Sequence, residues 1–165
     1  MRIVELGPGP GVGLAEALRV FPEAQFWGID LSREMLDQCR RRNLADVKSG
    51  RLHLLQGDTV SLVDLAPVDV VVAVHVLYFW HRPEVDLARI HDALTPGGVI
   101  ALGYRLRQHM PRISQVSFPK EGHLLYDSDA EVSALLDEAG FRSIEHRVVD
   151  DRPDAPTGHL ATAIA

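Results

Sequence analysis

The segment ELGPGPGVG, residues 5–13, places four glycines in seven positions directly after a short apolar stretch, residues 2–6. A segment with helical periodicity follows at residues 14–20, so the local order is strand, tight loop, helix. In an open α/β sheet, such a loop brings backbone N–H groups and a helix N-terminus to the carboxyl edge, where ligands bind. An ordinary turn is the alternative, but closely spaced glycines favour a loop that lets a ligand approach the backbone.

The chain up to residue 104 alternates apolar strands with helical segments. The run at residues 69–74 is continuous and β-branched, which is typical of a strand buried on both faces of a parallel sheet. Ser32 is a candidate N-cap, and Pro83 can occupy a first helical turn. This alternation implies parallel strands joined by right-handed crossovers in a doubly wound α/β sheet. We predict strands at residues 2–6, 25–29, 52–55, 69–74 and 99–104, and helices at residues 14–20, 33–43 and 83–94.

The remainder of the chain departs from this alternation. Residues 105–125 are polar and interrupted by prolines, so we expect an irregular segment there. A helix is predicted at residues 127–139, followed by strands at residues 142–149 and 159–164. Only the short loop from Asp150 to Gly158 separates these two strands, so we expect an antiparallel hairpin.

Composition limits the classes of function. With 165 residues and 46% hydrophobic content, the chain fits one compact domain over residues 1–165. The formal net charge is -6 without a long charged run, so nucleic acid is not expected as a partner, although residues 40–42 are three consecutive arginines. The single cysteine, Cys39, excludes an internal disulfide and indicates a cytoplasmic protein. The most apolar stretch, residues 68–80, is shorter than the about 20 residues that span a bilayer, so no membrane segment is predicted.

Two carboxylates accompany the glycine-rich loop. Asp30 ends the second predicted strand, where a carboxylate can accept hydrogen bonds from both ribose hydroxyls of a nucleoside cofactor; a helix cap is the alternative. Glu5 precedes the loop and can face a ligand's ammonium group, directly or through water. The spacing does not satisfy G-x-G-x-x-G, because Val12 and Leu14 stand where the third glycine would be. This weakens a dinucleotide interpretation.

Taken in order, these motifs resemble those of the class I S-adenosylmethionine (SAM)-dependent methyltransferases. Nearly the whole chain is covered. Within the superfamily, the chain is similar to the small-molecule branch that includes the ubiquinone and menaquinone biosynthesis C-methyltransferases. The resemblance implies a Rossmann-like, seven-stranded sheet of order 3-2-1-4-5-7-6 with strand 7 antiparallel. It implies transfer of the SAM methyl group to a small molecule. The motifs are ELGPGPG at residues 5–11, GIDLS at residues 28–32, Gly57-Asp58, the run at residues 70–80 and LTPGG at residues 94–98.

The resemblance also implies a cofactor site, position by position. The methionine part of SAM would be wrapped by Glu5, Gly7, Pro8, Gly9 and Gly11, and the ribose would be held by Asp30. The adenine would lie near Leu31, Met35, Gly57, Asp58 and Thr59, and His75 would stand where the family commonly uses main-chain carbonyls to receive the ammonium group. Asp58 as a turn residue and Met35 as helix core are the alternatives.

The sulfonium of SAM already carries an activated methyl group, so the main task of the protein is to align a nucleophile in a dry pocket. An acceptor with a high pKa needs a base, for which the candidates are His75, Tyr78, His81 and His109. A surface position for His81 and a wall or core position for Tyr78 are the alternatives. The histidine spacing predicts no metal site.

The chain departs from the family pattern at its start. Members usually carry a helical segment before the first strand that covers the cofactor, and here the chain begins at that strand. We expect a truncated start, a cover supplied by a homo-oligomer or partner subunit, or an open pocket. Residues 105–125 are the remaining candidate for a covering segment.

Two other functions stay open. One is an NAD(P)-dependent oxidoreductase on the same kind of sheet, which the glycine spacing, Glu5 and the antiparallel last strand disfavour. The other is a non-catalytic SAM-binding scaffold that acts through a partner.

Overall fold

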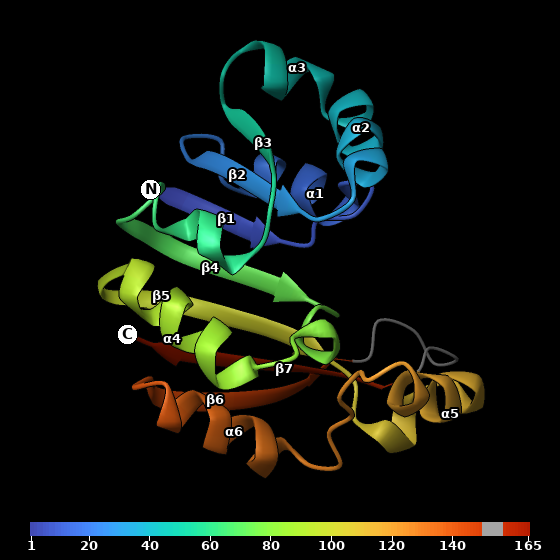
Figure 1. Ribbon diagram of the computed structural model, residues 1–165. Coiled ribbons are helices and arrows are strands. Elements are labelled where there is room, and N and C mark those ends of the chain that lie inside the picture. The colour runs from blue at the N-terminus through green and yellow to red at the C-terminus, as the bar shows by residue number, and fades with distance from the viewer. Residues whose placement is uncertain (150–156) are drawn as a thin grey trace.

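Seven strands form one sheet of order β3-β2-β1-β4-β5-β7-β6 (Figure 1). The computed structural model describes residues 1–149 and 157–165. Strands β1 to β5 pair in parallel, whereas β7 runs antiparallel to both β5 and β6. The predicted order and the antiparallel last strand are confirmed, although most of the predicted hairpin loop lies outside the described residues. The strands are β1 (Arg2–Leu6), β2 (Gln25–Asp30), β3 (Leu52–Gln56), β4 (Val68–Val74), β5 (Leu94–Tyr104), β6 (Arg142–Val149) and β7 (Gly158–Ile164).

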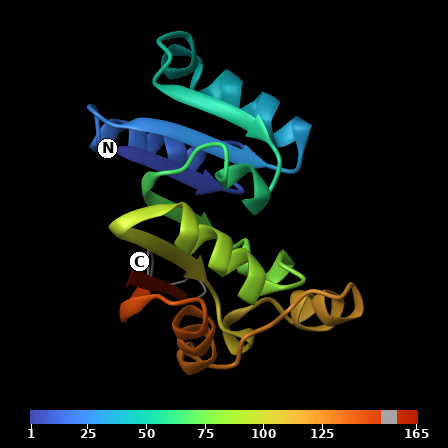
Figure 2. The same ribbon diagram turned by 60° about the vertical axis from the view of Figure 1, so that its left-hand side comes forward.

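Helices lie on both faces of the sheet, as the two ribbon views show (Figures 1 and 2). The predicted N-cap of α2 is confirmed, because Ser32 Oγ accepts a hydrogen bond from the Met35 N–H at 3.3 Å. The α-helices are α1 (Val12–Val20), α2 (Arg33–Arg42), α3 (Leu44–Lys48), α4 (Pro83–Ala93), α5 (Arg112–Lys120) and α6 (Asp129–Glu138). Short 3₁₀ turns are η1 (Thr59–Leu62), η2 (Leu77–Phe79) and η3 (Arg107–His109). Among the described helices, none is long and apolar enough to cross a membrane.

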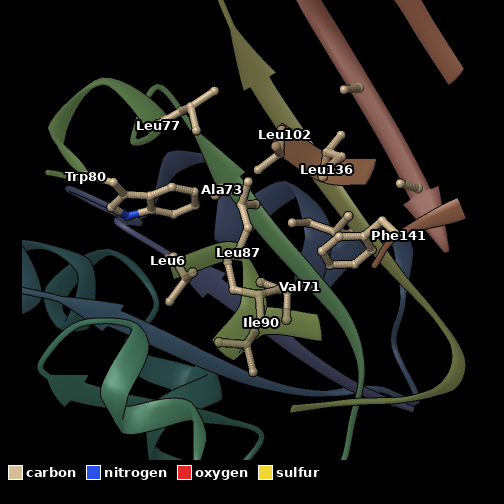
Figure 3. Packing of buried hydrophobic residues seen from close by; sticks show 14 of the residues in the cluster. Leu6, Val71, Ala73, Leu77, Trp80, Leu87, Ile90, Leu102, Leu136 and Phe141 are labelled. Carbon is tan, nitrogen blue, oxygen red and sulfur yellow. The ribbon is translucent and has the colours of Figure 1, made fainter. Parts of the chain in front are cut away.

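Side-chain alternation along β1 divides the core into two layers. Ile3 packs with Leu14 and Leu18 of α1, whereas Val4 and Leu6 point to the opposite face. The larger layer joins β4 and β5 to α4 and α6 (Figure 3). Its labelled members are Leu6, Val71, Ala73, Leu77, Trp80, Leu87, Ile90, Leu102, Leu136 and Phe141. Both faces of β1 are therefore buried, and its carboxyl end is held rigidly.

The prediction of an irregular segment at residues 105–125 is wrong. The structure places η3 and α5 there. Proline content misled the prediction, because Pro111 is the N-cap of α5, and Pro119 lies inside the helix but only one residue before its end, where there is little helix left to interrupt. β5 also starts earlier than predicted, since Leu94 pairs with Val68 before a register shift.

A partly buried polar network connects β5 to the C-terminal elements. The Tyr104 hydroxyl donates to Asp129 Oδ1 at 2.6 Å and lies 2.9 Å from His146 Nδ1. His146 Nε2 lies 2.7 Å from Ser133 Oγ in α6. Burial, followed by the Asp129 carboxylate, raises the pKa of Tyr104 well above its usual range. The phenol therefore stays protonated and acts as a fixed donor between β5, β6 and α6.

Replacing Tyr104 by Phe is expected to lower the free energy of unfolding by about 1–3 kcal/mol, because the partly buried Asp129 and His146 lose a hydrogen-bond partner. Urea denaturation measures the change. Tyr126→Phe is the matched control, since the Tyr126 hydroxyl is buried without a hydrogen-bond partner among the described residues. Equal losses in both variants would contradict a role for the network.

Candidate functional site

A cavity of about 290 Å³ opens at the carboxyl ends of β1, β2 and β4. The arrowheads of these three strands point toward the same edge of the sheet in Figure 1. Ligands bind at this edge in open α/β sheets, next to the crossover between the two halves. The lining consists of Leu6, Gly7, Ile29, Asp30, Leu31, Gly57, Asp58, Thr59, Val74, His75, Val76, Phe79 and Trp80.

Asp30, the last residue of β2, holds the glycine-rich loop through hydrogen bonds. Its Oδ2 accepts from the Gly9 N–H at 3.1 Å, and its Oδ1 accepts from the Ser32 N–H at 2.8 Å. Gly7 adopts a φ of 66°, and a Cβ there would lie 2.6 Å from Val76 Cγ2. The loop therefore needs glycine at that position. The Asp30 carboxylate lines the cavity and still has acceptor capacity beyond these two hydrogen bonds.

Other predicted loop residues lie behind the cavity. Gly11 is buried against α2, where a Cβ would lie 2.5 Å from Cys39 Sγ. Pro8 is buried as well, and the half-buried Met35 sits in α2. Neither Pro8, Gly9, Gly11 nor Met35 is among the lining residues. Close packing of the loop onto α2, more than contact with a ligand, explains the requirement at Gly11.

Glu5 is a buried carboxyl below the loop. The side chain is 9% exposed, and an ideal Cβ on Gly13 of α1 would lie 3.2 Å from its Oε1. Burial raises the pKa of Glu5 to about 7. Glu5 does not line the cavity, but no ion pair among the described residues compensates its charge. A cation bound above the loop would favour the ionised carboxylate.

Gly57, Asp58 and Thr59 follow the end of β3 and line the cavity. Asp58 caps η1, because its Oδ1 accepts from the Val60 N–H at 2.9 Å. The buried Thr59 hydroxyl donates to Asp86 Oδ1 at 2.5 Å, so only its backbone is available to a ligand. Leu31 is 72% exposed and lines the same wall. This wall offers an apolar surface beside hydrogen-bonding groups.

The candidate bases divide into three environments. His75 lines the cavity in a left-handed turn with φ 57°, and burial, followed by the charge of Arg105, lowers its pKa. Tyr78 is buried, lies 3.5 Å from His75 Nδ1 through its hydroxyl, and has a pKa that burial raises. His81 is exposed and outside the lining, and His109 contacts His159 at 3.3 Å instead. The structure thus brings His75 and Tyr78 together and leaves the other two apart.

Apart from Leu31, the apolar lining residues were not predicted as cofactor contacts. Leu6, Ile29, Val74 and Val76 lie at or just beyond strand ends, a position that could have identified them. Phe79 and Trp80 complete the wall. Among residues 1–149 and 157–165, no group of three or more His, Cys, Asp or Glu side chains is arranged to hold a metal ion.

The profile of a family described as "Methyltransferase domain" matches residues 3–98, which is more than half of the chain. The chain belongs to the methyltransferase-domain family. An uncharacterized methyltransferase, YdaC of Bacillus subtilis (strain 168), is 30% identical over 153 residues, which is 92% of this chain and 77% of that protein. A trans-aconitate 2-methyltransferase of Azoarcus sp. (strain BH72) is 31% identical over 143 residues, 86% of this chain but 49% of that protein.

A solved SAM-dependent methyltransferase from Aquifex aeolicus superposes with a TM-score of 0.75 at 20% identity, over 99% of this chain and 81% of that chain. This methyltransferase domain therefore has the Rossmann-like fold expected from its motifs. The domain spans about half of the length of the Azoarcus relative.

The raised pKa of Glu5 predicts a pH-dependent stability in the ligand-free domain. The folded state holds a proton that the unfolded state releases, so stability falls as the pH rises from the usual range of glutamate to about 7. The expected loss is about 3 kcal/mol, and Glu5→Gln should abolish it.

Urea denaturation of wild-type and variant protein between pH 5 and pH 8 measures the difference. Glu138→Gln, at an exposed position, is the control and should keep the wild-type pH dependence. Identical pH profiles for wild type and Glu5→Gln would show that Glu5 is not the responsible group.

Proposed function

We propose that the domain binds SAM in the cavity and transfers its methyl group to a small-molecule acceptor. The observation that carries this proposal is the carboxylate of Asp30, which lines the cavity while it holds the Gly9 N–H at 3.1 Å. This arrangement presents an acceptor for ribose hydroxyls next to a backbone loop open to a ligand. Membership of the methyltransferase-domain family supports the same cofactor.

The residues present fit such a cofactor. The acidic groups at the site, Asp30 and Asp58 in the lining and Glu5 behind the loop, suit a ligand with a sulfonium and an ammonium group. Leu31, which is 72% exposed, would be covered by an adenine ring. We propose that the lining residues contact the cofactor directly and that Glu5 acts on it through its charge. His75 would contact the cofactor through its backbone.

The chain's own contribution to transfer is alignment and exclusion of water. When bound, SAM supplies an activated methyl group on a sulfonium. Phe79 and Trp80 provide apolar walls, and Tyr78 and His75 offer neutral polar groups beside them. These residues hold the acceptor and keep water away from the reacting atoms.

We further propose a small-molecule acceptor, a cytoplasmic location, and a second copy of the chain or a partner subunit that covers the pocket. The name of the Azoarcus relative, a trans-aconitate 2-methyltransferase, supports a small acceptor. The single cysteine and the net charge of -6 support the location and disfavour nucleic acid.

Calorimetric titration with SAM, S-adenosylhomocysteine and NADH tests the cofactor class. The first two should bind and NADH should not bind. Binding of NADH alone would favour an oxidoreductase. Binding of SAM without methyl transfer to any acceptor in a broad panel would favour a non-catalytic scaffold.

Asp30→Ala is expected to raise the dissociation constant for SAM at least about tenfold, because the ribose loses a charged acceptor and the loop loses its anchor at Gly9. Calorimetry at constant pH measures the change. The control, Asp64→Ala, alters an exposed aspartate outside the cavity and should leave the affinity intact. An unchanged affinity in Asp30→Ala would remove this residue from the site.

A further inference from the structure

Arg105 lies at the carboxyl end of β5, beside the cavity. β4 and β5 pair in parallel with Val74 opposite Gly103, and the His75 N–H donates to the Gly103 carbonyl at 2.7 Å. Arg105 follows two residues after Gly103, so it stands at the same sheet edge as His75, which lines the cavity. Arg105 does not line the cavity itself, but its charge contributes to the lowered pKa of the lining residue His75, so the guanidinium lies near this side of the cavity.

The guanidinium of Arg105 lacks the partners that other half-buried arginines have. Within the described part of the chain, Arg51 pairs with Asp46 at 2.6 Å and Arg107 with Asp127 at 2.7 Å. Arg2 donates to a backbone carbonyl at 2.7 Å. Arg105 makes no such contact among residues 1–149 and 157–165, and its Nε is buried without a hydrogen-bond partner. An unpaired buried donor is costly, which indicates a group kept for a ligand.

The backbone of Arg105 is held in place by Tyr78. The Tyr78 hydroxyl accepts from the Arg105 N–H and donates to the Arg105 carbonyl at 3.3 Å. Tyr78 and Phe79 in turn pack against Phe118 of α5, with ring centroids 6.0 and 5.6 Å apart. The backbone of Arg105 is therefore held at a fixed point beside an aromatic wall, part of which lines the cavity through Phe79.

We propose that the methyl acceptor is a carboxylate oxygen of a small organic acid and that Arg105 holds this carboxylate. The inference rests on the proposed function, since it names the substrate class of the same site. A guanidinium matches a carboxylate through paired N–H donors. The aromatic wall of Tyr78, Phe79 and Phe118 suits the organic part of such an acid.

The chemistry of this step balances without a base. A carboxylate oxygen forms a bond to the methyl carbon, the bond from that carbon to sulfur breaks, and its electron pair stays on sulfur. The anion and the sulfonium become a neutral methyl ester and neutral S-adenosylhomocysteine, so no proton moves. An organic acid is already ionised at pH 7, whereas a phenol or alkylamine acceptor must lose a proton. The lowered pKa of His75 makes it a weak base, and the raised pKa of Tyr78 keeps its phenol protonated.

The test uses SAM that carries a label on its methyl group. The acceptors offered are the acids benzoate, octanoate and citrate and, as acceptors of the other classes, phenol and octylamine. We expect label in a product that releases methanol in alkali, as methyl esters do. In a second measurement, benzoate is titrated into the domain saturated with S-adenosylhomocysteine. Arg105→Gln should weaken benzoate binding at least about tenfold, and Arg105→Lys less, since lysine keeps the charge without the planar fork.

Arg112→Gln is the matched control, because Arg112 is an exposed arginine of α5 that makes no ion pair among the described residues. It should leave benzoate binding within about twofold of wild type. Arg105→Gln should keep wild-type affinity for SAM and a melting temperature no lower than that of the wild type, which separates a lost contact from a lost fold.

An alkali-stable product, no transfer to any of the acids, or equal benzoate binding by wild type and Arg105→Gln would each overturn the proposal. Failure of the wild-type domain to bind SAM would overturn the proposed function instead, and the cofactor titration reports that outcome separately.

Discussion

The carboxylate of Asp30 is the contact on which the site depends. One oxygen accepts from the Gly9 N–H and the other from the Ser32 N–H, so a single side chain fixes the loop after β1 and the entry to α2. Because β1 and β2 are neighbours buried between two layers of helices, this contact has a rigid base. The loop can then be rich in glycine without losing its shape.

Sequence reasoning was most successful where a residue's role follows from its place along the chain. The alternation of strands and helices was enough to predict a doubly wound sheet, and the resemblance to the methyltransferases implied its strand order. Gly7, Asp30 and Asp58, which the same resemblance placed in a cofactor site, line the cavity. Gly11 was assigned to the cofactor, but it packs against Cys39, because helix packing and ligand approach demand the same small residue. Arg105 was missed, since its importance arises from burial beside Tyr78, 27 residues away in sequence.

Within the described part of the chain, two ionisable side chains near this cavity are buried or partly buried without the partners that would stabilise their charges. Glu5 is buried without a counter-ion, and Arg105 has a buried donor without a partner, each among the described residues. Each of these groups lowers the stability of the ligand-free fold. Burial of the apolar layer around Leu87 and Ile90 offsets this cost (Figure 3). The two groups differ in sign and lie at different strands, so a bound cation and a bound anion would relieve them separately.

The position of β7 has a consequence for synthesis of the chain. β7 follows β6 in sequence, yet it lies between β5 and β6 in the sheet. While a ribosome is still making the residues before Gly158, β6 has no strand to pair with, and β5 presents an open hydrogen-bonding edge. The nascent domain must therefore keep that edge from other chains until its last strand emerges and inserts.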